Sequence, residues 1–132
     1  MNFSYKIDEN TELQLWSLFM KNDLYNLIEQ NRQYLFSYLR FIENIKSADH
    51  ATGLIEEGLD GYVKGTSLNL AIFYNSQLAG NIVLESIDTH KHMDAEISYW
   101  IGYQFEGRGI VTKSVKVMLE YAFTELNLNR VK

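Results

Sequence analysis

The sequence predicts a mixed α/β fold built around an antiparallel sheet, and three observations support this class. Apolar residues recur at helical spacing between Leu24 and Val63. From Leu68 to Ile101 the period changes to the alternation that is typical of strands, with short turns between them. Helical spacing then returns after residue 109. Helices on either side of a run of turn-linked strands favour one layered domain over residues 1–132.

The first elements expected are a strand and two helices. Residues 5–15, "YKIDENTELQL", alternate loosely between apolar and polar side chains. A helix should begin with Asp23 as its N-cap and continue to Ile42, either unbroken or as two helices that meet near Asn31. A second helical pattern over residues 51–63 should end at Gly65, a suitable C-cap.

The remaining elements expected are three strands, a helix and the start of another strand. The strands cover residues 68–74, 78–87 and 95–101, and they are linked by "NSQ" and by the polar "DTHKHMD". Strands joined by such short connections form an antiparallel meander. The apolar stripe from Val111 to Leu126 predicts a helix, and "LNRVK" is typical of the beginning of a strand.

Composition narrows the class of function. No apolar run approaches the about 18 residues of a membrane-spanning helix, and the N-terminus lacks the pattern of a secretory signal. The chain has no cysteine, which excludes thiolate chemistry and cysteine-ligated zinc. We therefore expect a cytoplasmic protein without a membrane partner. The net charge of −5 argues against a general nucleic-acid binder and is compatible with a cationic partner such as an amine.

Gly107 and Gly109 stand one residue apart between the third strand and the last helix. A P-loop would need Lys and Ser/Thr directly after Gly107, but Arg108 and Gly109 follow. A dinucleotide-binding fingerprint would need a third glycine where Thr112 stands. Glycines that open a helix can instead present backbone amides to an anion. A tight turn without a ligand explains the two glycines equally well.

The stretch "QFEGRG", which is Gln-x-x-Gly-x-Gly, follows a predicted strand and opens an amphipathic helix. It resembles the acetyl-CoA-binding motif of the GNAT superfamily of N-acetyltransferases. Residues 95–131 are similar to the ribosomal-protein N-acetyltransferases of the RimJ/RimL-like group, and "NRQYLFSYL" is similar to that group's segment after the first helix. The resemblance implies a GNAT-type fold, in which a mixed, mostly antiparallel sheet has helices on both faces.

The resemblance also implies a function and a set of site residues. Acetyl transfer from acetyl-CoA to a primary amine is expected, with a protein N-terminus as the acceptor; no metal is required. A small-molecule N-acetyltransferase and a non-catalytic acyl-CoA-binding domain are the alternatives. The residues expected to bind the cofactor are Ile101, Gly102, Tyr103, Gln104, Gly107, Arg108, Gly109, Ile110, Val111 and Thr112. Glu96 is the expected general base, and Glu85 is the weaker candidate.

Family members continue after the segment that matches "LNRVK" with the rest of that strand, a helix and a hairpin. We therefore expect the domain to be incomplete at its C-terminus, and a partner subunit, including a second copy, could cover an open sheet edge. His90 and His92 lack a clear third metal ligand, so a solvated loop is expected there. Tyr99 and Trp100 line a substrate pocket or pack in the core. Tyr34 follows helical spacing and is expected in the core or at the edge of a groove.

Overall fold

A computed structural model describes residues 4–37 and 39–132. Its centre is a six-stranded sheet in which the strands lie in chain order. Neighbouring strands are antiparallel from β1 to β5, and β6 is parallel to β5. The strands are β1 (Ser4–Lys6), β2 (Thr11–Leu15), β3 (Leu68–Tyr74), β4 (Gln77–Asp88), β5 (Asp94–Ile101) and β6 (Arg130–Val131). The predicted meander of β3, β4 and β5 is confirmed, as is the mixed, mostly antiparallel sheet.

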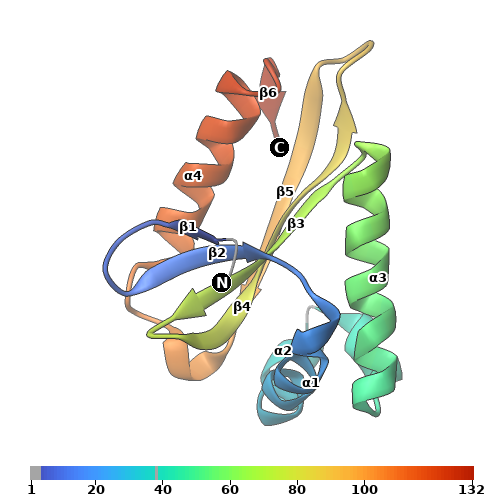
Figure 1. Ribbon diagram of the computed structural model, residues 1–132, viewed down its shortest axis with the longest axis vertical. Helices are drawn as coiled ribbons and strands as arrows, with labels where there is room; N and C mark the ends of the chain where they lie inside the picture. Colours follow the sequence, from blue (N-terminus) through green and yellow to red (C-terminus); the bar gives the residue numbers. More distant parts are fainter. Residues whose placement is uncertain (1–3, 38) are drawn as a thin grey trace.

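Helices cover both faces of this sheet, as Figure 1 shows. The α-helices are α1 (Lys21–Gln30), α2 (Arg32–Phe36), α3 (Ala48–Lys64) and α4 (Ile110–Thr124). Short 3₁₀ turns lie at η1 (Leu18–Met20), η2 (Arg40–Asn44) and η3 (Tyr103–Phe105). α1 and α3 pack against each other beside the sheet, and α4 crosses from β5 to the parallel β6 on the other face.

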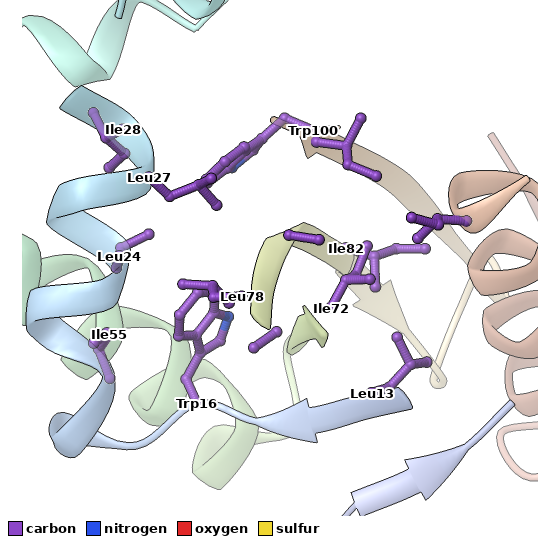
Figure 2. Packing of buried hydrophobic residues seen from close by; sticks show 14 of the residues in the cluster. Leu13, Trp16, Leu24, Leu27, Ile28, Ile55, Ile72, Leu78, Ile82 and Trp100 are labelled. Carbon is purple, nitrogen blue, oxygen red and sulfur yellow. The ribbon is translucent and has the colours of Figure 1, made fainter. Parts of the chain in front are cut away.

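The alternation of each strand decides which helix its side chains meet. On β3, Leu68 and Leu70 lie beside Val117 and Met118 of α4, whereas Asn69 lies beside α3. Buried apolar side chains from both layers and from the strands form one core, part of which is seen in Figure 2. The side chains that face α1 and α3 therefore occupy alternate positions, such as Asn69 on β3 and Asn81 and Glu85 on β4.

The single strand predicted over residues 5–15 is instead a hairpin. The Asp8 side chain accepts hydrogen bonds from the N–H groups of Asn10 and Thr11, both at 2.8 Å. An aspartate that binds the backbone just after itself favours a turn over an extended strand. The prediction of one strand was wrong because loose alternation continues through this turn, so β1 and β2 are separate antiparallel strands.

The first predicted helix begins and ends at different residues from those expected. It starts at Lys21, after Ser17 caps the turn η1, so Asp23 lies in the first turn of α1 and is not its N-cap. The predicted break at Asn31 is confirmed, since α1 ends at Gln30 and α2 begins at Arg32. Beyond α2 the expected helix gives way to the 3₁₀ turn η2; Tyr38, which falls within the prediction, lies outside the described residues.

The other predicted ends agree with the structure. Gly65 caps α3 with φ of 76°, and α4 covers the predicted stripe from Val111 to Ala122 but ends at Thr124, before Leu126. Within the described ranges, no helix combines the length and apolar character needed to cross a membrane.

Candidate active site

Strand β5 leads into a loop whose shape depends on Gly107 and Gly109. Their φ angles are +78° and +73°, in the left-handed region that glycine adopts without a steric penalty. A Cβ built on Gly107 would have no neighbour within 4 Å, and one on Gly109 would meet the Lys113 Cε at 4.0 Å. The glycines are therefore required by the backbone conformation and not by crowding.

Helix α4 begins directly after this loop, with Gly109 as its N-cap and no side chain capping the helix. The Lys113 N–H donates to the Gly109 carbonyl at 3.1 Å. The amides of Ile110, Val111 and Thr112 precede this bond, and the first amides of an α-helix have no partner within the helix. These amides and the positive end of the helix dipole form a site that suits an anion.

A cavity of about 530 Å³, which we name the loop cavity, lies between the end of β5 and the start of α4. It brings together six of the ten residues that the sequence predicted for cofactor binding. Tyr34, Tyr99, Trp100, Phe105 and Glu106 complete its wall. The six predicted residues are Ile101, Gly107, Gly109, Ile110, Val111 and Thr112.

The other four predicted residues lie elsewhere around the loop. Gln104 and Arg108 line a separate cavity of about 600 Å³, which we name the turn cavity, beside α1 and the β3–β4 turn. There the Gln104 amide donates to the Gln30 side chain at 3.1 Å, and the Arg108 guanidinium lies 5.5 Å from the centre of the Tyr74 ring. Gly102 and Tyr103 form the base of the loop.

On the α1 and α3 face of the sheet lies a cavity of about 460 Å³, which we name the sheet cavity. Side chains from α1, α3 and three strands line it, with Glu57 and Glu85 as its carboxylates. None of the described residues that line it is Lys, Arg or His. Tyr99 and Trp100 line both this cavity and the loop cavity, so the two meet at the end of β5. This electrostatic character favours a cationic ligand next to an anion site.

Comparison with known proteins identifies the family. Residues 18–132 match the family described as the acetyltransferase (GNAT) domain. The chain is 36% identical over 130 residues to the Bacillus subtilis (strain 168) protein named "Putative ribosomal N-acetyltransferase YdaF", covering 98% of this chain and 70% of that protein. The chain belongs to the GNAT family of acetyltransferases.

Solved structures agree with this assignment to the GNAT family. A crystal structure of a probable acetyltransferase superimposes with a TM-score of 0.90 at 36% identity, over 98% of this chain and 72% of that one. The microcin C7 self-immunity acetyltransferase MccE, crystallised with acetyl-CoA and AMP, gives a TM-score of 0.83 at 29% identity. That match covers 88% of this chain and 64% of MccE. The fold and family that the sequence predicted are thereby confirmed.

The two carboxylates proposed for this GNAT domain's chemistry lie opposite each other in the sheet. Glu85 of β4 pairs in register with Glu96 of β5, so their side chains share a face. Glu85 is half-buried, lines the sheet cavity and accepts a hydrogen bond from the Ser98 hydroxyl at 3.1 Å. Glu96 is exposed to solvent and does not line the sheet cavity. The role of Glu96 as general base stays a prediction, and the position of Glu85 in the sheet cavity strengthens Glu85 as the second candidate for that role.

Asn31 holds the loop in place through contacts that sequence reasoning missed. It is only 4% exposed at the break between α1 and α2. Its Oδ1 accepts the Tyr103 N–H at 2.8 Å, and its Nδ2 donates to the Leu27 carbonyl at 2.9 Å. It thereby fixes the base of the loop to α1. The helix break was visible in the sequence, but the partner 72 residues away was not.

Tyr34 stands at the edge of the loop cavity, one of the two positions expected for it. Its hydroxyl donates to the Glu106 carboxylate, and its ring lies edge-on to Tyr103 with 5.5 Å between the ring centres. These contacts join α2 to the loop.

An ion pair anchors the first turn of α4 from the other side. The Lys113 ammonium lies 2.6 Å from the Asp8 carboxylate, in the turn between β1 and β2. The hydrogen bond from Lys113, together with the Asn10 and Thr11 amides, holds the pKa of Asp8 well below its usual range. The charged pair therefore persists at neutral pH.

His90 and His92 lie in the turn between β4 and β5. Their backbone N–H groups donate to the Asp88 carboxylate at 3.0 and 3.3 Å. Among residues 4–37 and 39–132, no group of three or more His, Cys, Asp or Glu side chains is arranged to hold a metal ion.

Proposed function

We propose that this GNAT domain transfers an acetyl group from acetyl-CoA to the N-terminal amine of a protein. One observation carries the proposal: the loop cavity, with its open amides, meets the acidic sheet cavity at Tyr99 and Trp100. An anionic cofactor and a cationic acceptor can thus enter from two sides and meet at the end of β5. Holding two reactants together in this way accounts for much of the acceleration of such a bimolecular reaction.

The residues of the loop cavity fit the chemistry of acetyl-CoA. The amides of Ile110, Val111 and Thr112 suit the negatively charged pyrophosphate, and Gly109 leaves the helix start without a side chain that would block it. The end of β5, from Tyr99 to Ile101, offers backbone groups along which the pantetheine arm pairs as an added strand would. MccE, at 29% identity, was crystallised with acetyl-CoA, which supports this choice of cofactor. Bound acetyl-CoA supplies the acyl group as a thioester.

The chain's own residues prepare the amine. A primary amine is protonated at neutral pH and must lose a proton before it attacks a carbonyl carbon. Glu85 lies within the sheet cavity to accept this proton, directly or through water. Glu96, the base predicted by resemblance, lies opposite Glu85 and reaches the amine through water from outside the cavity. A backbone N–H group at the end of β5 donates to the thioester carbonyl oxygen and so polarises it.

The proposed acceptor rests on relatives and on charge. The B. subtilis relative carries the name of a ribosomal N-acetyltransferase, and the sheet cavity has two carboxylates for an ammonium group. A ribosomal-protein acceptor implies a cytoplasmic location. The similarity to the self-immunity acetyltransferase MccE, solved with AMP, favours a small-molecule amine as the second candidate.

Calorimetric titration with acetyl-CoA, using ATP and NAD as controls, tests the cofactor. We expect saturable binding of acetyl-CoA and none of the controls. Radiolabelled acetyl-CoA then tests the acceptor with peptides that carry free or blocked N-termini and with small amines. Label in the free peptides alone supports the proposal. Label in small amines alone selects the second candidate, and cofactor binding without transfer to any amine selects a non-catalytic acyl-CoA-binding domain.

A further inference from the structure

Three side chains from distant parts of the chain meet on the floor of the sheet cavity. The Trp16 indole N–H donates to the Oδ1 atoms of both Asn69 and Asn81, each at 3.0 Å. Trp16 follows β2 and lies between α1 and the strands (Figure 2), while the two asparagines belong to β3 and β4. All three line the cavity. Because both Oδ1 atoms accept from the same indole nitrogen, the side-chain amides of Asn69 and Asn81 lie close together.

The indole fixes which way each asparagine points. An indole nitrogen can donate but cannot accept, so the atoms that face it must be the two oxygens. The Nδ2 groups, with two N–H donors each, are consequently turned away from Trp16. They make no hydrogen bond with the described residues, and no unpartnered side-chain nitrogen there is fully buried. Each Nδ2 therefore keeps surface that is open to the cavity.

Gly58 gives further support for a functional Asn69 amide. It lies inside α3, where glycine costs about 1 kcal/mol of stability relative to alanine. A Cβ at this position would lie 3.1 Å from the Asn69 Nδ2. Glycine thus leaves room for the amide at the wall of the cavity.

We infer that Asn69 and Asn81, oriented by Trp16, bind the first carbonyl oxygen of a peptide acceptor and so select a peptide N-terminus over a simple amine. The inference rests on the proposed function and names residues that determine its specificity. Each of the two Nδ2 groups donates one N–H to the carbonyl oxygen, which has two lone pairs to accept them. Glu85 lies on the same strand face as Asn81 and receives the amine. A site built to hydrogen-bond a substrate group discriminates strongly against analogues that lack it.

The test compares alaninamide with isopropylamine, which lacks the carbonyl. Asn69→Asp and Asn81→Asp keep an oxygen for the indole but replace the N–H donors with an acceptor. We expect the ratio of kcat/KM for alaninamide to kcat/KM for isopropylamine to fall at least 10-fold in each variant, with KM for acetyl-CoA within about 3-fold of wild type. Asn22→Asp, at an exposed position of α1, adds the same charge outside the cavity. It should leave kcat/KM unchanged for both amines.

Trp16→Phe provides a second variant that keeps an apolar ring but removes the indole donor. It should also lower kcat/KM for alaninamide more than for isopropylamine, because both asparagines can then rotate. Thermal melting identifies any variant that fails to fold. Equal losses with both amines in the folded variants, or no preference of the wild type for alaninamide, would overturn the inference. If the wild type acetylates no amine, the proposed function fails and the inference fails with it.

Discussion

The loop cavity and the sheet cavity share the end of β5 but are built in different ways. The loop cavity takes its shape from backbone, since the positive φ angles of Gly107 and Gly109 and the first turn of α4 present amides. The sheet cavity takes its character from side chains of separate elements, such as Trp16, Asn69 and Glu85. The fold thus combines a cofactor site formed by backbone amides with an acceptor site formed by side chains. Substitutions can alter the second site without altering the first.

The largest effect is expected where the two cavities meet. Gly80 of β4 pairs with Ile101, and a Cβ at Gly80 would lie 2.2 Å from the Trp100 carbonyl oxygen. Gly80→Ala should therefore separate β4 from β5 and lower the free energy of unfolding by about 3 kcal/mol, as overpacking in a core does. Urea denaturation measures this. Binding in both cavities should weaken, because β5 lines both.

Gly53→Ala is the matched control for Gly80→Ala. Gly53 lies in α3, and a Cβ there would have no neighbour within 4 Å. Alanine should stabilise the helix by about 1 kcal/mol. Equal effects of the two substitutions on stability would show that close approach of β5 does not constrain Gly80.

The next largest effect is expected on catalysis alone, at a carboxylate of the sheet cavity. Glu85→Gln should lower kcat about 100-fold, which is typical of losing a general base, and leave the affinity for acetyl-CoA unchanged. Glu96→Gln, measured in parallel by steady-state kinetics, should have a smaller effect because Glu96 is exposed and outside the cavity. A larger loss in Glu96→Gln than in Glu85→Gln would mean that Glu96, expected from the family resemblance, is the general base and that Glu85 is not.

A third effect is confined to the loop cavity. Gly109→Ala places a side chain in the left-handed region at a cost of about 1 kcal/mol, and it should weaken acetyl-CoA binding about 10-fold in calorimetry. Gly65→Ala creates the same backbone strain at the end of α3, with φ of +76° and no neighbour within 4 Å. It should cost similar stability without changing the affinity. Equal losses of affinity would assign the effect of Gly109→Ala to general destabilisation.

The contrast between the cavities also explains what the sequence could predict. The loop cavity draws most of its wall from residues 99–112, so one contiguous motif predicted six of its residues. The sheet cavity joins Trp16 to partners 53 and 65 residues away, and no local pattern records such contacts. Asn31 appeared in the sequence as a helix break, yet its hydrogen bond to Tyr103 depends on how α1 packs. Local periodicity likewise missed the turn that Asp8 makes between β1 and β2.

The smallest effect is expected at the ion pair outside both cavities. The folded state lowers the pKa of Asp8, so the pair adds stability above the unfolded value of about 3.9 and loses it as the pH falls further. Asp8→Asn should slightly lower the melting temperature at pH 7, and the difference from wild type should shrink steadily as the pH falls from about 4 to about 2. Thermal melts across this range measure it. A difference that stays constant with pH would exclude the ion pair as its cause.

The central claim is that the amides at the start of α4 bind the phosphates of acetyl-CoA. Its most direct test is an NMR titration of the ¹⁵N-labelled chain with acetyl-CoA, following each backbone amide. We predict that the largest shifts fall on residues 107–112, with further shifts at Tyr99–Ile101 of β5. Saturable binding whose largest shifts fall on residues 74–78 of the turn cavity, or no shift at residues 107–112 at saturating acetyl-CoA, would contradict the claim.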